Sequence, residues 1–185
     1  GVDIIVGGDL RAMFDGHSAP VIILGAEYNL AKYTGISELF ASVELFGGLA
    51  TGDMQAAIDD ANTLRAFLLT PDAVTVAGGD LLAIKRIYMG PLYLQVGVGA
   101  TAARYLVADS DSYSYGITSY GGTGQGGVGL QLSSRLMIDG VVGYRYLMPT
   151  LSIVDKSDPD YDGGLGAVNA TDGGLNMGLR IRYTY

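Results

Sequence analysis

Charged residues recur at alternate positions in this sequence, and that spacing decides what chemistry they can do. Asp9 and Arg11 are two residues apart, as are Arg180 and Arg182 near the carboxyl end. Residues at i and i+2 of an extended strand point to the same face of a sheet. The chemistry expected of such a face is ion pairing between side chains of neighbouring strands.

Eight charged residues share the polar parity of the strands identified below, and we expect them to line the interior of a narrow barrel. They are Asp3, Asp9, Arg11, Glu27, Glu44, Arg145, Arg180 and Arg182. Buried charges are costly unless they are paired. Asp9, Glu27 and Glu44 are therefore the expected partners of Arg180 and Arg182. A narrow polar or ion path through the same residues is the alternative interpretation.

The segment DPDYDGGLGAVN, residues 158 to 169, offers a different chemistry. Carboxylates at alternate positions followed by glycine are typical of the start of a calcium loop. The candidate ligands are Asp158, Asp160, Asp162, Gly164 and Asn169. Position twelve is an asparagine and not the bidentate glutamate of an EF-hand, so we expect at most a weak calcium site. A solvated acidic loop is the simpler interpretation, and no other cofactor is indicated.

Nucleophilic catalysis has little support, because the chain holds one histidine, His17, and no cysteine. A Ser-His-acid hydrolase needs a serine within hydrogen-bond reach of the histidine. Ser18 is adjacent to His17, and adjacent side chains diverge on an extended strand or turn. We therefore expect that the protein is not an enzyme.

The elements that position these side chains are indicated by a period-two alternation of apolar and polar residues. It is found in segments 2–14, 21–30, 39–48, 81–89, 91–103, 127–132, 137–148 and 173–185. The fourth segment is the least clear, since Lys85 and Arg86 are adjacent and leave its phase ambiguous. Several segments reach the roughly 9–11 residues that a tilted strand needs to cross a bilayer.

The connections alternate between short and long. Short turns at 31–35, 89–91 and 133–135 contrast with long connections at 51–80, 107–127 and 149–174. This is the pattern of bacterial outer-membrane barrels, and an even number of strands puts both termini on the short-turn, periplasmic side. Apolar residues at helical spacing between Met54 and Leu68 predict a short helix in the second outer loop.

The composition of the polar parity separates a membrane barrel from a water-soluble one, which would also alternate. It consists mostly of Gly, Ser, Gln and Asn with single charges, and charged residues are only 16% of the chain. A narrow interior accommodates such residues, whereas a water-facing surface would carry many more charges. Tyrosines near strand ends, Tyr28, Tyr88, Tyr144 and Tyr146 among them, fit an interfacial aromatic girdle.

The formal charge of −8 argues against a nucleic-acid-binding protein, which would need a basic face. No run of about 18 apolar residues predicts a transmembrane helix. The chain begins at Gly1 without a secretory leader, and we expect a mature form from which a leader was removed.

The strings QLSSRLMIDGVVGYRYLM and GLNMGLRIRYTY resemble the strand-turn-strand and closing strand of small eight-stranded outer-membrane proteins, the OmpA/OmpW-like superfamily. The resemblance implies an all-β, closed, antiparallel, up-and-down transmembrane barrel of about eight strands, spanning residues 1–185 as one domain. Ile181, Tyr183 and Tyr185 resemble the carboxyl-terminal signal read by the barrel-assembly machinery, although phenylalanine is commoner than tyrosine at the last position.

These observations together predict a protein of the Gram-negative outer membrane with a structural or interaction role through long extracellular loops. The expected partners are the lipid bilayer, lipopolysaccharide, the assembly machinery during insertion and other outer-membrane proteins. Two alternatives are an OmpW-like narrow channel for small solutes and a constitutive subunit of a larger outer-membrane assembly.

Overall fold

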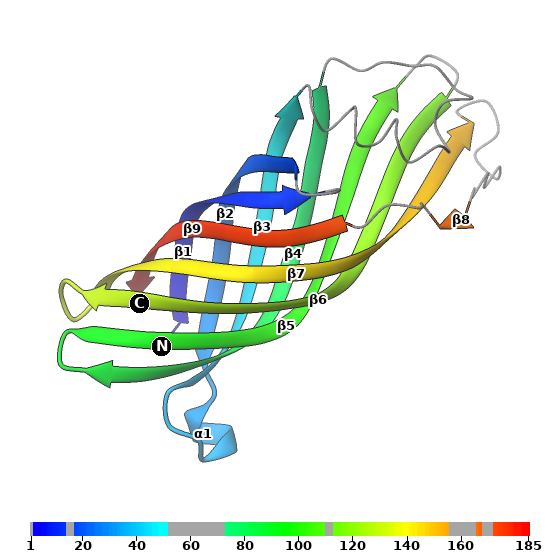
Figure 1. Cartoon of the computed structure of the whole chain (residues 1–185). Coiled ribbons are helices and arrows are strands. Elements are labelled where there is room, and N and C mark those ends of the chain that lie inside the picture. Colours follow the sequence, from blue (N-terminus) through cyan, green and yellow to red (C-terminus); the bar gives the residue numbers. More distant parts are fainter. Residues whose placement is uncertain (1, 14–16, 52–72, 110–112, 156–165, 168–171) are drawn as a thin grey trace.

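The computed structural model describes residues 2–13, 17–51, 73–109, 113–155, 166–167 and 172–185 (Figure 1). Its long strands are β1 (Val2–Met13), β2 (His17–Asn29), β3 (Leu39–Thr51), β4 (Ala73–Met89), β5 (Leu92–Asp109), β6 (Tyr113–Gln131), β7 (Leu136–Asp155) and β9 (Asp172–Thr184). A two-residue strand, β8 (Gly166–Ala167), pairs with β7. The described residues also include one short helix, α1 (Ala31–Thr34), and no helix among them is both long and apolar enough to span a membrane.

The eight long strands form a closed antiparallel barrel. Each of the strands from β1 to β7 pairs with its neighbour in the chain, β7 also pairs with β9, and β9 pairs with β1. Closure places Asp3 opposite Thr184 and Arg11 opposite Asn176. The predicted all-β, up-and-down barrel of about eight strands is confirmed, and no edge of the sheet is left open between the long strands.

Both chain ends and α1 lie at the same end of the barrel, where the short turns are (Figure 1). Gly35 ends α1 with a φ of 70°, and Gly90 has a φ of 68° in the turn between β4 and β5. Glycine adopts this left-handed region without the steric cost that a Cβ would bring. The helix predicted between residues 54 and 68 lies outside the described residues.

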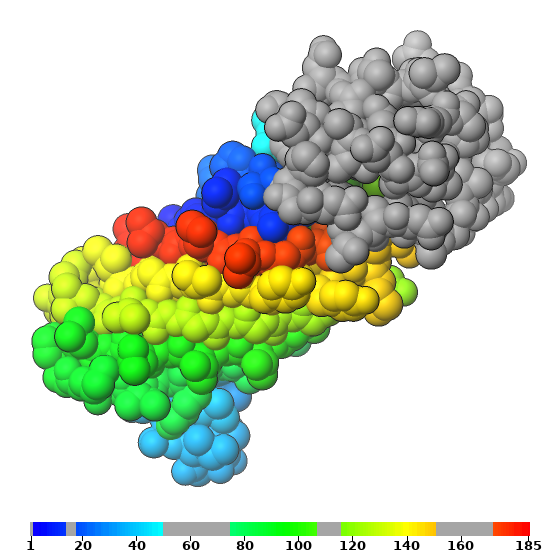
Figure 2. Space-filling view, viewed as in Figure 1, coloured from blue at the N-terminus to red at the C-terminus, as the bar shows by residue number. Residues whose placement is uncertain are grey.

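The outer wall of the barrel is apolar. Ile22, Leu24, Val98 and Leu179 are each more than half exposed on it, and Figure 2 shows strands β9, β7, β6 and β5 side by side along one face of this wall. Among strand residues whose side chains the structure describes, two outward-facing charges remain. They are Lys85 and Arg104.

The two outward charges bound an uncharged band around the barrel. Lys85 lies beside Val96 of β5, which leaves eight residues along that strand up to Arg104. Eight residues extend about 27 Å along a strand. With the usual tilt of about 35–45°, the band is roughly 20 Å tall, close to the apolar belt of a transmembrane barrel.

Strands β4 to β7 contain 17 to 20 residues, whereas β1, β2, β3 and β9 contain 12 or 13. The predicted long connections were therefore too long, because residues 73–80, 113–126 and 149–155 belong to strands. Glycine is depleted in strands, so the run YGGTGQGG indicates a loop. In the structure this run is part of β6, and at Gly121 a Cβ would fall on the Tyr146 carbonyl of β7.

Candidate functional site in the barrel interior

The inward-facing side chains of the barrel are rich in charge. Among the described residues, the buried charged ones are Asp3, Asp9, Arg11, Glu27, Glu44, Asp80, Arg86, Asp139, Arg145, Asp172, Arg180 and Arg182, each at most 7% exposed. Seven are carboxylates and five are arginines. Removing such groups from water costs several kcal/mol per ion unless each finds a partner. The pairing of these twelve groups therefore determines whether the barrel interior is stable.

The terminal-side layer, composed of Glu27, Arg86, Asp139 and Arg182, lies nearest the chain ends. Arg182 contacts two carboxylates, with Nη1 at 2.8 Å from Glu27 Oε2 and Nε at 2.6 Å from Asp139 Oδ1. Arg86 Nη2 is 2.6 Å from the other oxygen of Glu27, Oε1. These residues come from β2, β4, β7 and β9, so the layer crosses the full width of the lumen.

Two neutral side chains of β5 complete the terminal-side layer. Tyr93 Oη donates to Asp139 Oδ1 at 2.7 Å, and Gln95 Nε2 donates to Asp139 Oδ2 at 2.9 Å. Gln95 Oε1 in turn accepts from Arg86 Nε at 3.3 Å. With Tyr93 at 0% and the four charged groups at 0–1% exposed, a water-sized molecule does not reach this layer.

The central layer, composed of Asp9, Arg11, Glu44, Asp80 and Arg180, lies farther from the chain ends. Arg180 forms ion pairs with both oxygens of Asp9, Nη2 being 2.9 Å from Oδ2. Its Nη2 and Nε also lie 2.9 and 3.1 Å from Glu44 Oε2. Arg11 joins Asp9 to Asp80, with its Nε at 3.0 Å from Asp9 Oδ2 and its Nη2 at 2.8 Å from Asp80 Oδ2.

Beyond the central layer, aromatic and hydroxyl groups surround a further arginine. The Phe46 ring centroid lies 4.0 Å from Arg11 Cζ and 4.9 Å from Arg145 Cζ, an arrangement that stabilises both cations through the π face. Arg145 Nη2 donates to Thr101 Oγ1 at 2.9 Å. Tyr105 Oη contacts both carboxylate oxygens of Asp172 at 3.0 Å.

The structure places all eight residues of the expected charge network in the interior. It brings Arg180 to Asp9 and Glu44, and Arg182 to Glu27, the three carboxylates that the sequence made candidates. The interior holds four further charges that the sequence analysis did not include. They are Asp80, Arg86, Asp139 and Asp172.

The sequence offers a different signal for each of these four charges. Asp139 lies on the polar parity of its segment, which indicates an inward side chain. Asp80 and Asp172 fall in segments whose composition predicts loops. Arg86 follows Lys85 in the segment of ambiguous phase, and the structure resolves that phase. Arg86 points inward over the Phe40 ring, whereas Lys85 lies outside and donates to the Ser37 carbonyl.

The residues of the expected insertion signal lie on the outer wall at the end of β9. Ile181 and Tyr183 are about half exposed, and Tyr185 is 87% exposed. The backbone N–H of Tyr185 donates to the Val2 carbonyl at 3.1 Å, and its ring meets that of Tyr183 edge to face.

The candidate calcium ligands Asp158, Asp160, Asp162, Gly164 and Asn169 all lie outside the described residues. Within the described part of the chain, no cluster of three or more His, Asp or Glu side chains is arranged to hold a metal ion. The calcium site thus stays a prediction from the sequence.

The fold of the whole chain is similar to that of several solved outer-membrane proteins. The chain matches Neisserial surface protein A over 100% of its own length and 96% of that protein, with a TM-score of 0.61 and 13% identity. It matches a major outer membrane protein of Thermus thermophilus (TM-score 0.59, 13% identity, 100% and 98% covered). It also matches OprG of Pseudomonas aeruginosa (TM-score 0.57, 15% identity, 100% and 96% covered).

No family model matches the sequence, and no curated protein matches it. At 11–15% identity the structural matches show the fold and not the activity. That fold is the small eight-stranded barrel of bacterial outer-membrane proteins.

Proposed function

We propose that this protein is an integral outer-membrane barrel whose lumen is a sealed structural core and whose working surface is its outer rim and loops. The observation that carries the proposal is the inside-out distribution of charge. The strand residues facing outward are apolar over a band of roughly 20 Å, while twelve charged side chains of the described residues are buried within. A protein folded in water has the opposite preference.

The terminal-side layer supports a structural role for the lumen. Each of its two arginines contacts at least one carboxylate at 2.6–2.8 Å, and the layer leaves no exposed surface large enough for water. An ion crossing it would have to separate pairs held in a low dielectric. The interaction role then belongs to the loops, since connecting segments on a rigid scaffold commonly carry binding residues.

Reconstitution tests the proposal directly. The refolded full-length chain should stay in liposomes after a carbonate wash and should give no measurable conductance in planar bilayers. Release of the protein by carbonate would contradict membrane insertion. Steady conductance of the wild-type chain would contradict the sealed lumen and favour the narrow channel.

The narrow channel is the second candidate, because the lumen holds buried polar atoms without a hydrogen-bond partner in the described part of the chain. They include Nε and Nη1 of Arg145 and Oδ1 of Asn176, and in the central layer Nη1 of Arg11 and Oε1 of Glu44. Water in the lumen would satisfy them. If the lumen is a channel, the wild type should already conduct and Arg182→Ala should raise that conductance. If the lumen is sealed, the wild type should give no conductance.

A constitutive assembly subunit would be recognised by the proteins that co-purify with it and not by the structure of its lumen. Extraction from native membranes in a mild detergent would then yield partners at fixed stoichiometry. A single band of this chain after the same extraction would contradict that version of the interaction role.

A further inference from the structure

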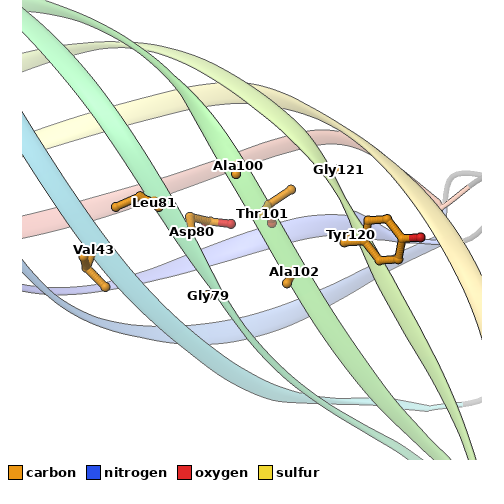
Figure 3. A pocket seen from close by; sticks show the side chains of 9 residues that line it. All are labelled: Val43, Gly79, Asp80, Leu81, Ala100, Thr101, Ala102, Tyr120 and Gly121. Atoms are coloured by element: carbon orange, nitrogen blue, oxygen red, sulfur yellow. The ribbon is translucent and has the colours of Figure 1, made fainter.

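An apolar groove of about 470 Å³ crosses the outer wall over strands β3 to β6 (Figure 3). Its shape follows from residue size. Gly79, Ala100 and Ala102 have little or no side chain at the wall, and bulkier Leu81 and Tyr120 stand beside them. The strand register aligns the set, with Gly79 opposite Ala102 and Ala102 opposite Tyr120.

The groove has a cation at one end. Arg104 is the next residue after Ala102 on the same face of β5, about 7 Å along the strand. It is exposed, and its Nη1 donates to Thr118 Oγ1 of β6 at 2.8 Å. A guanidinium carries five N–H donors in a planar fork, more than one hydroxyl can accept. Its geometry matches the two oxygens of a phosphate.

A cation at the end of an apolar groove matches a molecule with an anionic head and a hydrocarbon chain. Arg104 lies at the end of the apolar band away from the chain termini, which is the outer-leaflet side if the barrel sits as proposed above. The phosphorylated amphiphile of that leaflet is the lipid A part of lipopolysaccharide. Lys85, the other outward cation, lies at the opposite end of the band and does not line this groove.

We propose that this groove is a lipid A site, in which Arg104 binds a phosphate and one acyl chain lies along Gly79, Ala100 and Ala102. The inference rests on the proposed outer-membrane location and adds a specific ligand to it. The groove is shallow and largely open, so it would contact one side of the chain and leave the other side to the surrounding lipid. The acyl chain is the expected occupant because the groove opens in the apolar band, where no aqueous solute would displace lipid.

The test measures binding of diphosphoryl lipid A to the refolded full-length barrel in detergent, by native mass spectrometry across a lipid titration. One lipid A per barrel should stay bound to the wild type. Arg104→Gln should weaken binding about fivefold, the size of a partly exposed charge pair. Ala102→Leu fills the groove and should weaken it about tenfold, since it displaces several methylenes of the chain.

Two matched variants control for general effects. Lys85→Gln removes the other outward cation, and Ala83→Leu adds the same bulk to the same wall outside the groove. Both should bind lipid A as the wild type does. Equal weakening by Arg104→Gln and Lys85→Gln, or by Ala102→Leu and Ala83→Leu, would overturn the site.

Other occupants give distinct results. Phosphatidylglycerol binding as tightly as lipid A would replace this proposal with a general anionic-lipid surface. A dimer in analytical ultracentrifugation that Ala102→Leu dissociates would assign the groove to a second copy of the chain. Failure of the wild type to remain in carbonate-washed liposomes would instead refute the outer-membrane function, and the two failures are thereby told apart.

Discussion

The hydroxyl of Tyr93 on β5 donates a 2.7 Å hydrogen bond to Oδ1 of Asp139 on β7, reaching past the strand that lies between them. The residue of that strand opposite both is Gly129 of β6. A Cβ at Gly129 would run into the Tyr93 ring. The absence of a side chain at one position therefore permits a contact that spans three strands.

Gly129→Ala should lower the free energy of unfolding by about 1–3 kcal/mol, the usual cost of adding bulk to a packed interior. The added methyl group displaces the Tyr93 ring and weakens its bond to Asp139. Urea unfolding in lipid or detergent measures the change. Gly126→Ala on the same strand is the control, because its Cβ would meet only the Gln95 carbonyl at 3.8 Å. An equal loss of stability in both variants would show that alanine destabilises β6 at either position, and not specifically beside Tyr93.

Arg182→Met should lower the free energy of unfolding by about 3–5 kcal/mol, as expected when one partner of a buried ion pair is removed. The change leaves Glu27 and Asp139 with one fewer cation between them. In a double-mutant cycle with Asp139→Asn, the two changes should couple by at least about 1 kcal/mol. Arg135→Gln in the exposed turn should change stability by no more than about 0.5 kcal/mol. Additive effects of the two lumen changes would mean that Arg182 and Asp139 do not interact.

The loss caused by Arg180→Met should be nearly independent of salt. Arg180, Asp9 and Glu44 are 0–5% exposed, and buried pairs are screened far less than exposed ones. Between about 0.05 and about 0.5 M salt, the difference in unfolding free energy between variant and wild type should change by less than about 0.5 kcal/mol. A difference that halves at high salt would indicate that water and ions enter the central layer.

Tyr185→Ala should reduce assembly in cells without reducing stability in vitro. The side chain is 87% exposed and contacts little beyond the Tyr183 ring, so refolding in detergent should be unchanged. The amount of heat-modifiable, folded protein in cell envelopes should fall several-fold if the assembly machinery reads this residue. Tyr144→Ala, also on the outer wall, controls for loss of a surface aromatic. A parallel loss in both variants would refute the signal.

The barrel could be predicted from the sequence because period-two alternation survives along most of the chain. In the closing strand, Leu175 and Leu179 lie on the outer wall and Arg180 lies inside, as their parity requires. The alternation of apolar and polar residues within one strand distinguishes its outward and inward faces, whichever strands lie beside it. That is why fold class and the direction of most charges follow from the residues alone.

The start of β6 could not be predicted, because glycine has no side chain to show which face of a strand is apolar. Residues 121 to 129 of β6 hold six glycines, so the alternation that marks the other strands is missing there. These glycines pair regularly with β5 and β7. Backbone hydrogen bonds to two neighbouring strands hold the segment in place, an influence that only the tertiary structure supplies.

The ion-pair partners depend on the stagger between strands, which a sequence does not display. Asp9 lies opposite Gly178 in the register, yet its carboxylate meets Arg180, one inward position away on β9. Arg182 of the same strand reaches Glu27, which belongs to a strand that does not pair with β9. Such diagonal contacts follow from barrel closure and tilt, and not from the spacing of charges along one strand.

The position of Arg180 and Arg182 on the last strand has a consequence for biosynthesis. These two residues supply cations to Asp9, Glu27, Glu44 and Asp139, and Arg180 is separated from Asp9 by 171 positions in the chain. Until the ribosome has made the final strand, Glu44 and Asp139 lack a guanidinium partner and two strand edges lack a neighbour. Asp9 and Glu27 then have only Arg11 and Arg86 as cations. Contacts this distant in sequence form late and slowly. A chain truncated before this strand should therefore fail to fold as a whole and stay open to proteolysis.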